Sequence, residues 1–327
     1  MKHVQTFKSL ARTILISVFL PKTARAKKRL LSISIMFFFA LGATQSNAQT
    51  FKRSQDYVFD LQITAGITPF LGDLGGSFNN GSRSFSDIDI SSLGSCLGAG
   101  MGIRVSKHWY LRAAYINATV KGNDIWSENE GRRIRNLSFK SPINEIYAVA
   151  EYTIASIKVG NIALEPRLFG GIGYFTFNPQ ALYNGKWVEL QPLGTEGQGL
   201  KNNTSFYKKT SLSIPFGVAL QARISDKNSI GFVLNFHKSF TDYIDDVSGT
   251  YYDNAELRSQ RGDAAADLAD RHLTNNDSPL ASGSKRGNPN NNDNFGFISM
   301  VYSHSFGRTK SYHKASSAHL YKCFNNF

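Results

Sequence analysis

The sequence predicts an all-β protein, an eight-stranded antiparallel transmembrane β-barrel of the outer-membrane type. Three observations predict it: an export signal near the N-terminus, eight windows in which apolar residues alternate with small or polar ones, and connections that alternate between long and short. Alternation with a period of two indicates a strand whose two faces meet different surroundings. The 327 residues are enough for one such barrel with long loops.

The net charge of +13 is concentrated at the two ends of the chain. Residues 1–48 contain eight lysines and arginines, residues 307–327 contain four more, and neither segment contains an aspartate or a glutamate. The segment between them carries a charge of only about +1. A nucleic-acid-binding protein concentrates its basic residues on the folded domain, so this pattern argues against nucleic acid as a partner.

The N-terminal segment has the parts of a cleavable secretory signal. The basic residues 27–29 precede an apolar run over residues 30–42, and Ser46 and Ala48 are the small residues that a signal peptidase reads. A helix needs about 20 apolar residues to cross a bilayer, so this shorter run disfavours a membrane anchor. We expect cleavage after Ala48 and three segments: an N-terminal extension with the signal peptide (1–48), the barrel (49–306) and a basic C-terminal tail (307–327).

Eight windows after the signal carry the strand alternation. In the first, Phe59, Leu61 and Ile63 fall on one face, and Asp60 and Gln62 fall on the other. The apolar faces are expected to contact lipid and the other faces to line the lumen. The eight windows span residues 57–67, 97–105, 109–119, 143–154, 162–175, 211–224, 229–240 and 295–306.

Charged residues fall on the inward faces of these windows. An arginine on the lipid face at the bilayer midplane would cost about 2–4 kcal/mol, whereas in a narrow lumen acids and bases can pair and close the interior. Pro166 and Pro215 each remove a ladder donor and predict a bulge or a strand end. The predicted lumen charges are Asp60, Arg104, Arg112, Glu145, Glu151, Glu165, Arg167 and Arg223.

The connections between the windows alternate in length, which is the topology of outer-membrane barrels. We expect the short ones in the periplasm, the long ones outside the cell, and both termini in the periplasm. The last long connection contains the tripeptide Arg261-Gly262-Asp263, which arises easily by chance, and residues 264–271 then predict a short surface helix. The connections span residues 68–95, 106–108, 120–142, 156–161, 176–210, 225–228 and 241–294.

Five stretches beside the predicted strand ends carry a family resemblance: PFLGDLGG (69–76), RAAYINATVKGND (112–124), RNLSFKSPINEI (135–146), FTDYIDDVSGTYYD (240–253) and RGNPNNNDNFGF (286–297). Over residues 57–308 the chain resembles the Bacteroidota outer-membrane β-barrel family that includes PorG of the type IX secretion system. The resemblance implies an eight-stranded barrel that works with periplasmic ring lipoproteins in protein export. Its most specific segment contains Thr241, Asp242, Tyr243, Asp245 and Asp246.

Two kinds of motif suggest ligands but favour simpler interpretations. The glycine-rich runs 98–102 and 170–173 do not open a helix after a strand, as a phosphate-binding loop would, so we interpret them as small residues in a crowded lumen. Carboxylates could hold Ca²⁺, but their spacing matches no EF-hand loop, so turn hydrogen bonds and loop capping are preferred. No metal or other cofactor is predicted. The carboxylates in question are Asp242, Asp245, Asp246 and Asp253.

The leading functional hypothesis is a non-enzymatic barrel that anchors or docks a secretion or envelope complex. A small passive pore or a surface adhesin acting through the long loops is the alternative. A lipid-modifying barrel enzyme is the third class, because His237, Ser239 and His304 occur in the last two windows. His237 points inward and has no acidic partner at a matching outward position, so no catalytic residue is predicted. The expected partners are outer-membrane lipids and, by resemblance, periplasmic ring lipoproteins.

Overall fold

The computed structural model describes residues 58–74, 92–127, 129–160, 162–200, 205–273 and 280–306, and the structural statements below refer to these residues. The chain divides into two compact units, Met1–Gln55 and Asp56–Phe327. The first unit, which includes the expected signal peptide, lies outside the described residues, and so does the basic tail from residue 307 onward.

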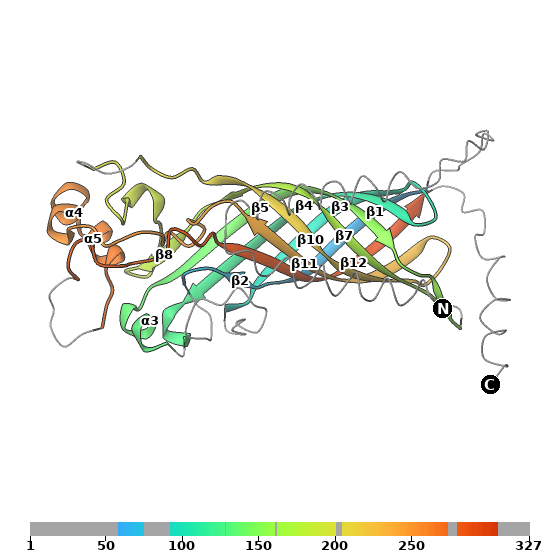
Figure 1. Cartoon of the computed structure of the whole chain (residues 1–327), viewed down its shortest axis with the longest axis horizontal. Coiled ribbons are helices and arrows are strands. Elements are labelled where there is room, and N and C mark those ends of the chain that lie inside the picture. Colours follow the sequence, from blue (N-terminus) through green and yellow to red (C-terminus); the bar gives the residue numbers. More distant parts are fainter. Residues whose placement is uncertain are drawn as a thin grey trace, which may run out of the picture. The chain divides into compact units, whose positions relative to one another are not determined.

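Eight antiparallel strands form a closed barrel (Figure 1), which confirms the predicted fold class. Each of these strands pairs with the next one along the chain, and the last pairs with the first. Closure gives every strand two hydrogen-bonded neighbours, as a strand surrounded by hydrocarbon requires. The strands are β1 (Val58–Thr68), β3 (Gly94–Arg104), β4 (Trp109–Asn123), β5 (Ser138–Thr153), β7 (Ile162–Phe177), β10 (Thr210–Arg223), β11 (Asn228–Ser239) and β12 (Asn294–Phe306).

The outer surface of the barrel is a band of exposed apolar side chains. Ile172 is 73 % exposed, Ile146 is 65 % exposed and Leu97 is 62 % exposed, while their neighbours along each strand are mostly buried. Soluble proteins rarely expose a continuous apolar surface of this kind to water. A membrane barrel exposes such a surface to lipid. The predicted strand faces are therefore confirmed.

β4 and β5 extend furthest beyond their predicted windows at the end that carries the long loops. β4 continues to Asn123 and β5 starts at Ser138, so the connection predicted at 120–142 shortens to 124–137. The inward residues of the extension include the apolar Val120 and Phe139, which are buried. Its outward residues include Lys121 and Lys140. The extension was missed because the outward face becomes polar there, beyond the apolar band.

The two prolines lie at irregularities of the sheet, as expected. Pairing between β10 and β7 lapses between Ser213 and Phe216, on either side of Pro215. Pro166 adjoins Arg167, where the pairing of β7 with β5 ends. There the Pro166 carbonyl still accepts a hydrogen bond from the main-chain N–H of Ile154 at 2.9 Å.

The connections alternate in length as predicted. At the turn end, residues 105–108 and 224–227 are tight turns, and the third connection contains the short strand β6 (Ile157–Val159), which pairs with β7. At the loop end, β2 (Phe70–Leu71) pairs with β12, and β8 (Gln180–Tyr183) forms a hairpin with β9 (Lys186–Glu189). We call the long connections the loop cap: residues 69–74, 92–93, 124–127, 129–137, 178–200, 205–209, 240–273 and 280–293.

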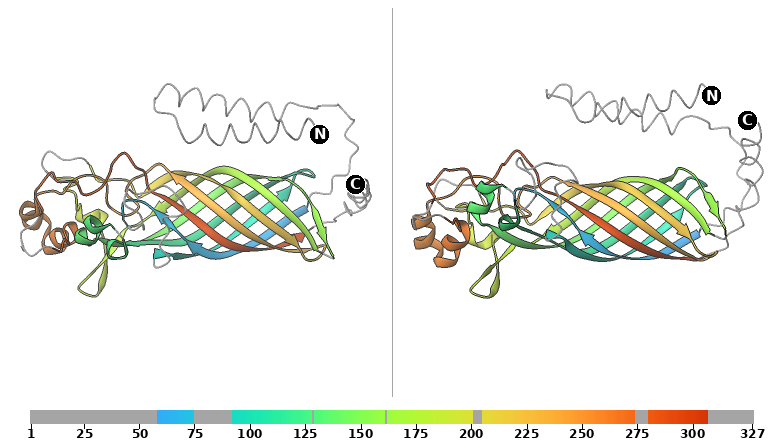
Figure 2. Two further views of the ribbon diagram at one scale, coloured as in Figure 1. Left: turned by 60° about the horizontal axis from the view of Figure 1, so that its bottom comes forward. Right: turned by 90° about the horizontal axis from the view of Figure 1, so that it is seen from below.

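The loop cap also holds three α-helices, which Figures 1 and 2 show at the same end of the barrel. They are α3 (Glu130–Arg135), α4 (Asn254–Arg261) and α5 (Asp263–Ala269), and the 3₁₀ turns Asp124–Trp126 and Gln191–Leu193 accompany them. Among the described residues, no helix is long and apolar enough to cross a membrane.

The helix expected at residues 264–271 exists as α5, and the Asp263 and Asp267 side chains on it are exposed. Ala265, Ala266 and Leu268 on its other face are buried, and α5 packs against α4 through Leu257. The small alanine side chains allow this close helix packing. No pattern predicted α4, which buries only Leu257.

Candidate functional site

The structure places all eight predicted lumen charges on inward faces and joins six of them in one network. Glu151 accepts hydrogen bonds from Arg112 at 2.7 Å and from Arg167 at 3.0 Å. Arg167 also donates to Glu165 at 2.7 Å. Buried ion pairs therefore link the three adjacent strands β4, β5 and β7. Such pairs contribute favourably only when each charge keeps its partners.

Glu165 is the second centre of this network. Arg104 and Arg223 each donate to it at 2.9 Å, so that three arginines surround one carboxylate. An aromatic ring covers one of these guanidinium groups, with the Arg167 guanidinium carbon 4.9 Å from the centre of the Tyr110 ring. The network crosses the lumen near the turn end.

The other two acids have partners that the sequence did not indicate. Asp60 accepts a hydrogen bond from the Tyr110 hydroxyl at 2.8 Å. Glu145 accepts one from the Ser213 hydroxyl at 2.5 Å, and its Oε1 lies 2.8 Å from His237 Nδ1. The expectation that four acids pair with four bases was therefore wrong for these two. Parity alone does not reveal which inward residues face each other across the barrel.

His237 lies in a buried aromatic box. Its ring stacks on Phe295 with a centroid distance of 5.0 Å and meets Phe297 and Tyr147 edge to face. Phe175 and Ile143, also fully buried, belong to the apolar cluster that fills the lumen on the loop side. Side chains thus fill the interior, as the dimensions of an eight-stranded barrel favour.

The three residues considered for catalysis are not brought together. His237 contacts Glu145, His304 lies 2.8 Å from the Asn228 side-chain oxygen, and the Ser239 hydroxyl donates to the main-chain carbonyls of Asp293 and Thr241. A nucleophile and its base must lie within hydrogen-bond reach, and none of these side chains meets another of the three in such a way.

The family-resemblance segment 241–246 lies at the centre of the loop cap. Asp245 accepts hydrogen bonds from the main-chain N–H groups of Leu74 at 3.0 Å and Val247 at 2.9 Å. Tyr243 stacks on Tyr207 at 4.3 Å. The Thr241 carbonyl accepts from the N–H of Asp293 at 3.0 Å. The segment therefore ties three connections together.

Asp246 also links two of these connections. It accepts hydrogen bonds from the Thr195 hydroxyl at 2.5 Å and the Tyr207 hydroxyl at 2.6 Å. Burial raises its pKa to about 6, although the neighbouring Arg286 acts in the opposite direction. The carboxylate thus binds the β7–β10 connection to the β11–β12 connection.

Four buried carboxylates, those of Asp73, Asp242, Asp245 and Asp293, influence one another in the loop cap. Burial and the neighbouring carboxylates of Asp73 and Glu196 raise the pKa of Asp242 to about 8. Burial and the nearby acids also raise the pKa values of Asp245 and Asp293 well above the ordinary value. With a pKa of about 8, Asp242 keeps its proton at neutral pH.

Of the four acids considered for Ca²⁺, one caps a helix and one accepts a hydrogen bond within a turn. Asp253 caps α4 by accepting from the N–H of Glu256 at 2.7 Å, and Asp245 accepts within its own turn. Among the described residues, no group of three or more acids, histidines or cysteines is arranged to hold a metal ion. Arg261 of the Arg-Gly-Asp tripeptide donates to the carbonyls of Pro192 and Gln198.

Two arginines that sequence reasoning missed organise the loop cap. Arg286, almost fully buried, donates to Glu196 at 3.0 Å and to the Asp246 carbonyl at 2.6 Å. Arg135 pairs with Asp124 at 2.7 Å and donates to the Arg286 carbonyl at 2.7 Å. Each is the first residue of a stretch that carries the family resemblance, and this position was the sequence feature that could have indicated their role.

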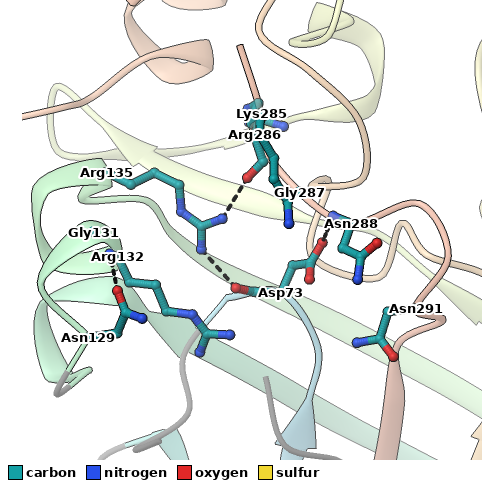
Figure 3. Close-up of a pocket in the computed structure, with 10 residues that line it drawn as sticks. All are labelled: Asp73, Asn129, Gly131, Arg132, Arg135, Lys285, Arg286, Gly287, Asn288 and Asn291. Carbon is teal, nitrogen blue, oxygen red and sulfur yellow. Dashed lines mark hydrogen bonds between the residues drawn. The ribbon is translucent and has the colours of Figure 1, made fainter. Parts of the chain in front are cut away.

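A pocket of ≈ 380 Å³ opens beside these arginines. Figure 3 shows Arg132 and Arg135 extending from α3 toward Asp73, with Asn288 and Asn291 on the opposite side. Lys285 and Arg286 complete a predominantly basic lining. Burial raises the pKa of Asp73, while its main-chain partner Asn288 and the charges of Arg135, Arg132 and Lys285 act in the opposite direction.

The closed barrel, its apolar exterior and its charged, filled interior define a transmembrane β-barrel of the outer-membrane class. Within that class, the chain belongs to the family described as Domain of unknown function (DUF6089), whose profile matches residues 35–267. The match includes every strand of the barrel except β12.

Solved structures similar to this chain are eight to eleven per cent identical to it in sequence. Neisserial surface protein A is 11 % identical, covers 76 % of this chain and 97 % of its own, and has a TM-score of 0.31. A major outer membrane protein from Thermus thermophilus is 10 % identical, with 76 % and 99 % covered and a TM-score of 0.33. OprG from Pseudomonas aeruginosa is 9 % identical, with 76 % and 96 % covered and a TM-score of 0.32. We draw no functional conclusion from similarities at this level. No curated protein matches the sequence significantly.

Proposed function

We propose that this protein is a non-enzymatic, non-conducting outer-membrane barrel that anchors or docks a protein complex of the cell envelope. The observation that carries the proposal is the filled lumen: an ion-pair network at the turn side and an aromatic cluster at the loop side occupy the path that a solute would take. A barrel that conducts nothing must act through its surfaces, which favours docking over a passive pore.

The type IX secretion system is the specific candidate for that complex. The sequence resemblance to the PorG family supports it, because two of the resembling stretches begin at Arg135 and Arg286, which organise the loop cap. Short turns in outer-membrane barrels face the periplasm and long loops face outward. In this proposal the signal peptide is removed after Ala48, both termini are periplasmic, and the turn end meets periplasmic ring lipoproteins.

The turn end offers a charged surface for such a partner. Each of its three connections presents an exposed lysine, namely Lys107, Lys158 and Lys227. Lysines at the rim of an interface increase the association rate with an acidic partner through long-range attraction. We therefore place the docking contact at these turns.

Two measurements test the proposal. Deletion of the gene should abolish export of type IX cargo, and normal export with intact surface proteins would contradict the secretion role. Purified protein in planar bilayers should give no steady conductance, and a nanosiemens conductance would contradict a closed lumen.

A charge-reversal experiment tests the docking surface. The triple variant Lys107→Glu, Lys158→Glu and Lys227→Glu should lose a ring lipoprotein that co-purifies with the wild type in low salt. The matched control reverses Lys186 and Lys208, which are exposed in the loop cap. Equal loss in both variants, or no loss in the first, would rule out the turn end as the docking surface.

A further inference from the structure

We infer that the pocket in the loop cap binds an anionic saccharide, that is, a sugar unit bearing a phosphate or carboxylate group. This inference does not rest on the proposed docking role. The pocket lies among three connections, contributed by Asp73, by α3 and by residues 285–291. Its volume of ≈ 380 Å³ falls toward the lower end of small-molecule sites, which span about 300–1,000 Å³.

Positive charge dominates the pocket wall. Arg132, Arg135, Lys285 and Arg286 line it, against a single carboxylate from Asp73. Arg135 and Arg286 pair with acids behind the wall. Lys285 is exposed and Arg132 is partly exposed. Both Arg132 and Lys285 line the pocket together with Asp73. Guanidinium and ammonium groups are the usual partners of phosphate and carboxylate.

The carboxylate of Asp73 indicates that the ligand also carries hydroxyl groups. Asp73 Oδ2 accepts the main-chain N–H of Asn288 at 2.5 Å, and the carboxylate lines the pocket between the basic residues. A bare anion has no proton to donate to it, whereas a sugar hydroxyl could donate to it. Carboxamides both donate and accept hydrogen bonds, and those of Asn288 and Asn291 suit a polyol in the same way.

The composition of the wall excludes other ligand classes. Every lining side chain is polar, charged or absent, the last at Gly131 and Gly287. A lipid chain or an aromatic base would therefore find no apolar surface to contact, and apolar surface is what binds such ligands in most pockets. An anionic, hydroxylated ligand is the class that this wall complements.

The pocket is preformed by hydrogen bonds between its walls. Arg135 donates to the carbonyls of Asp73 at 2.8 Å and Arg286 at 2.7 Å, and it thereby fixes two walls with one side chain. At Gly287 a Cβ atom would lie 2.6 Å from Asp73 Oδ2 and 2.8 Å from the Ser248 main chain. The main chain can approach so closely only because this residue is glycine. Preformed sites lose less entropy when a ligand binds.

Calorimetric titration of the full chain in phosphatidylcholine nanodiscs tests the inference. The probes are glucose 1-phosphate and glucuronate, and glucose and inorganic phosphate serve as comparisons. At least one of the two anionic sugars should bind more tightly than both comparisons. If neither binds, the inference is wrong. If inorganic phosphate binds at least as tightly as the tighter of the two anionic sugars, the site recognises an anion alone and the saccharide assignment is overturned.

Variants test whether binding occurs in this pocket. Arg132→Gln and Lys285→Gln should each weaken binding about tenfold, as loss of one charge-assisted hydrogen bond does. Arg133→Gln is the control for the first, because Arg133 is exposed on the same helix outside the pocket, and Lys186→Gln is the control for the second. Folding of each variant is checked by its mobility in unheated SDS gels. Binding that is unchanged in both pocket variants, or equally weakened in the controls, would overturn the assignment.

Anionic saccharides occur both free in solution and as part of lipopolysaccharide. Nanodiscs that contain lipopolysaccharide distinguish these sources. If the lipid competes with the soluble probe in the wild type, the source is a neighbouring glycolipid, and if it does not, the source is a free or foreign saccharide. Either outcome supports an anionic saccharide, provided that the competition is also sensitive to Arg132→Gln.

Discussion

Arg167 on β7 and Glu151 on β5 meet inside the barrel, with Arg167 Nη1 3.0 Å from Glu151 Oε2. Both side chains are almost completely buried, and Arg167 also donates to Glu165 at 2.7 Å. A charge so buried remains favourable only while its partners stay in place. The ion pairs of Arg167 therefore both link β5 to β7 and fill the lumen.

Replacement of Arg167 by methionine should lower the free energy of unfolding by about 3–5 kcal/mol, because it leaves two buried carboxylates short of a partner. Urea unfolding in lipid vesicles measures the change. Ile172→Val, on the lipid face of the same strand, is the control and should stay within about 0.5 kcal/mol. A loss in Arg167→Met no greater than in the control would show that the network is not structural.

The two adjacent glycines of β7 should respond differently to alanine. At Gly171 a Cβ atom would collide with the main chain of β5, at the Ala148 carbonyl and at Val149 Cα, whereas at Gly170 the nearest atom is the Pro215 carbonyl at 4.0 Å. Gly171→Ala should destabilise the barrel by about 1–3 kcal/mol or more, and Gly170→Ala should have little effect. Refolding yield into vesicles and urea unfolding compare them. Similar behaviour of the two variants would contradict the close approach at Gly171.

This difference shows what the sequence pattern could and could not predict. A period of two assigns each residue to a face of its strand. It therefore predicted the lumen charges and the lipid-facing residues of the eight barrel strands. It cannot say how closely two strands approach, which separates Gly171 from Gly170. Nor does it identify partners across the barrel, such as His237 with Glu145, because these depend on register and stagger.

The loop cap was less predictable for a different reason. Its residues follow no period, and its structure depends on single contacts such as those of Arg135 and Arg286 with main-chain carbonyls. A basic residue in a polar loop looks like a solvated surface group. Here each arginine is buried beside an acid that neutralises it. Asp124, which precedes α3, pairs with Arg135 at the end of that helix. Glu196, distant in sequence, pairs with Arg286.

Loss of the Arg286 side chain should loosen the loop cap without unfolding the barrel. Arg286→Met leaves Glu196 and Asp246 without their cation and removes hydrogen bonds to the Asp246 and Ala269 carbonyls. Digestion of the cap by chymotrypsin should become at least about tenfold faster, since a tenfold change corresponds to about 1.4 kcal/mol. The barrel strands should remain protected. Arg133→Met, which changes an exposed arginine of the cap, should digest like the wild type, and equal digestion of both variants would contradict the role of Arg286.

The carboxylate cluster should make the loop cap less stable as pH rises. Burial, with Asp73 and Glu196 nearby, raises the pKa of Asp242 from 3.8 to about 8, so the folded cap binds a proton that the unfolded cap has released. Its contribution to stability is complete below the unfolded pKa, decreases through the interval between the two values, and is lost above about pH 8. Asp245 and Asp293 act in the same direction, because burial and neighbouring acids raise their pKa values also.

Asp242→Asn tests this dependence because it replaces the titrating carboxyl group with a neutral amide of the same shape. The variant cap should resist protease better than the wild type at pH 8 and show a weaker decline between pH 5 and pH 9. Digestion half-lives, normalised at each pH to an unfolded peptide substrate, measure the two profiles. Asp226→Asn, in an exposed turn at the other end of the barrel, should leave the decline unchanged. If the Asp242→Asn and wild-type profiles coincide, Asp242 does not titrate in the folded cap and the cluster does not set its pH dependence.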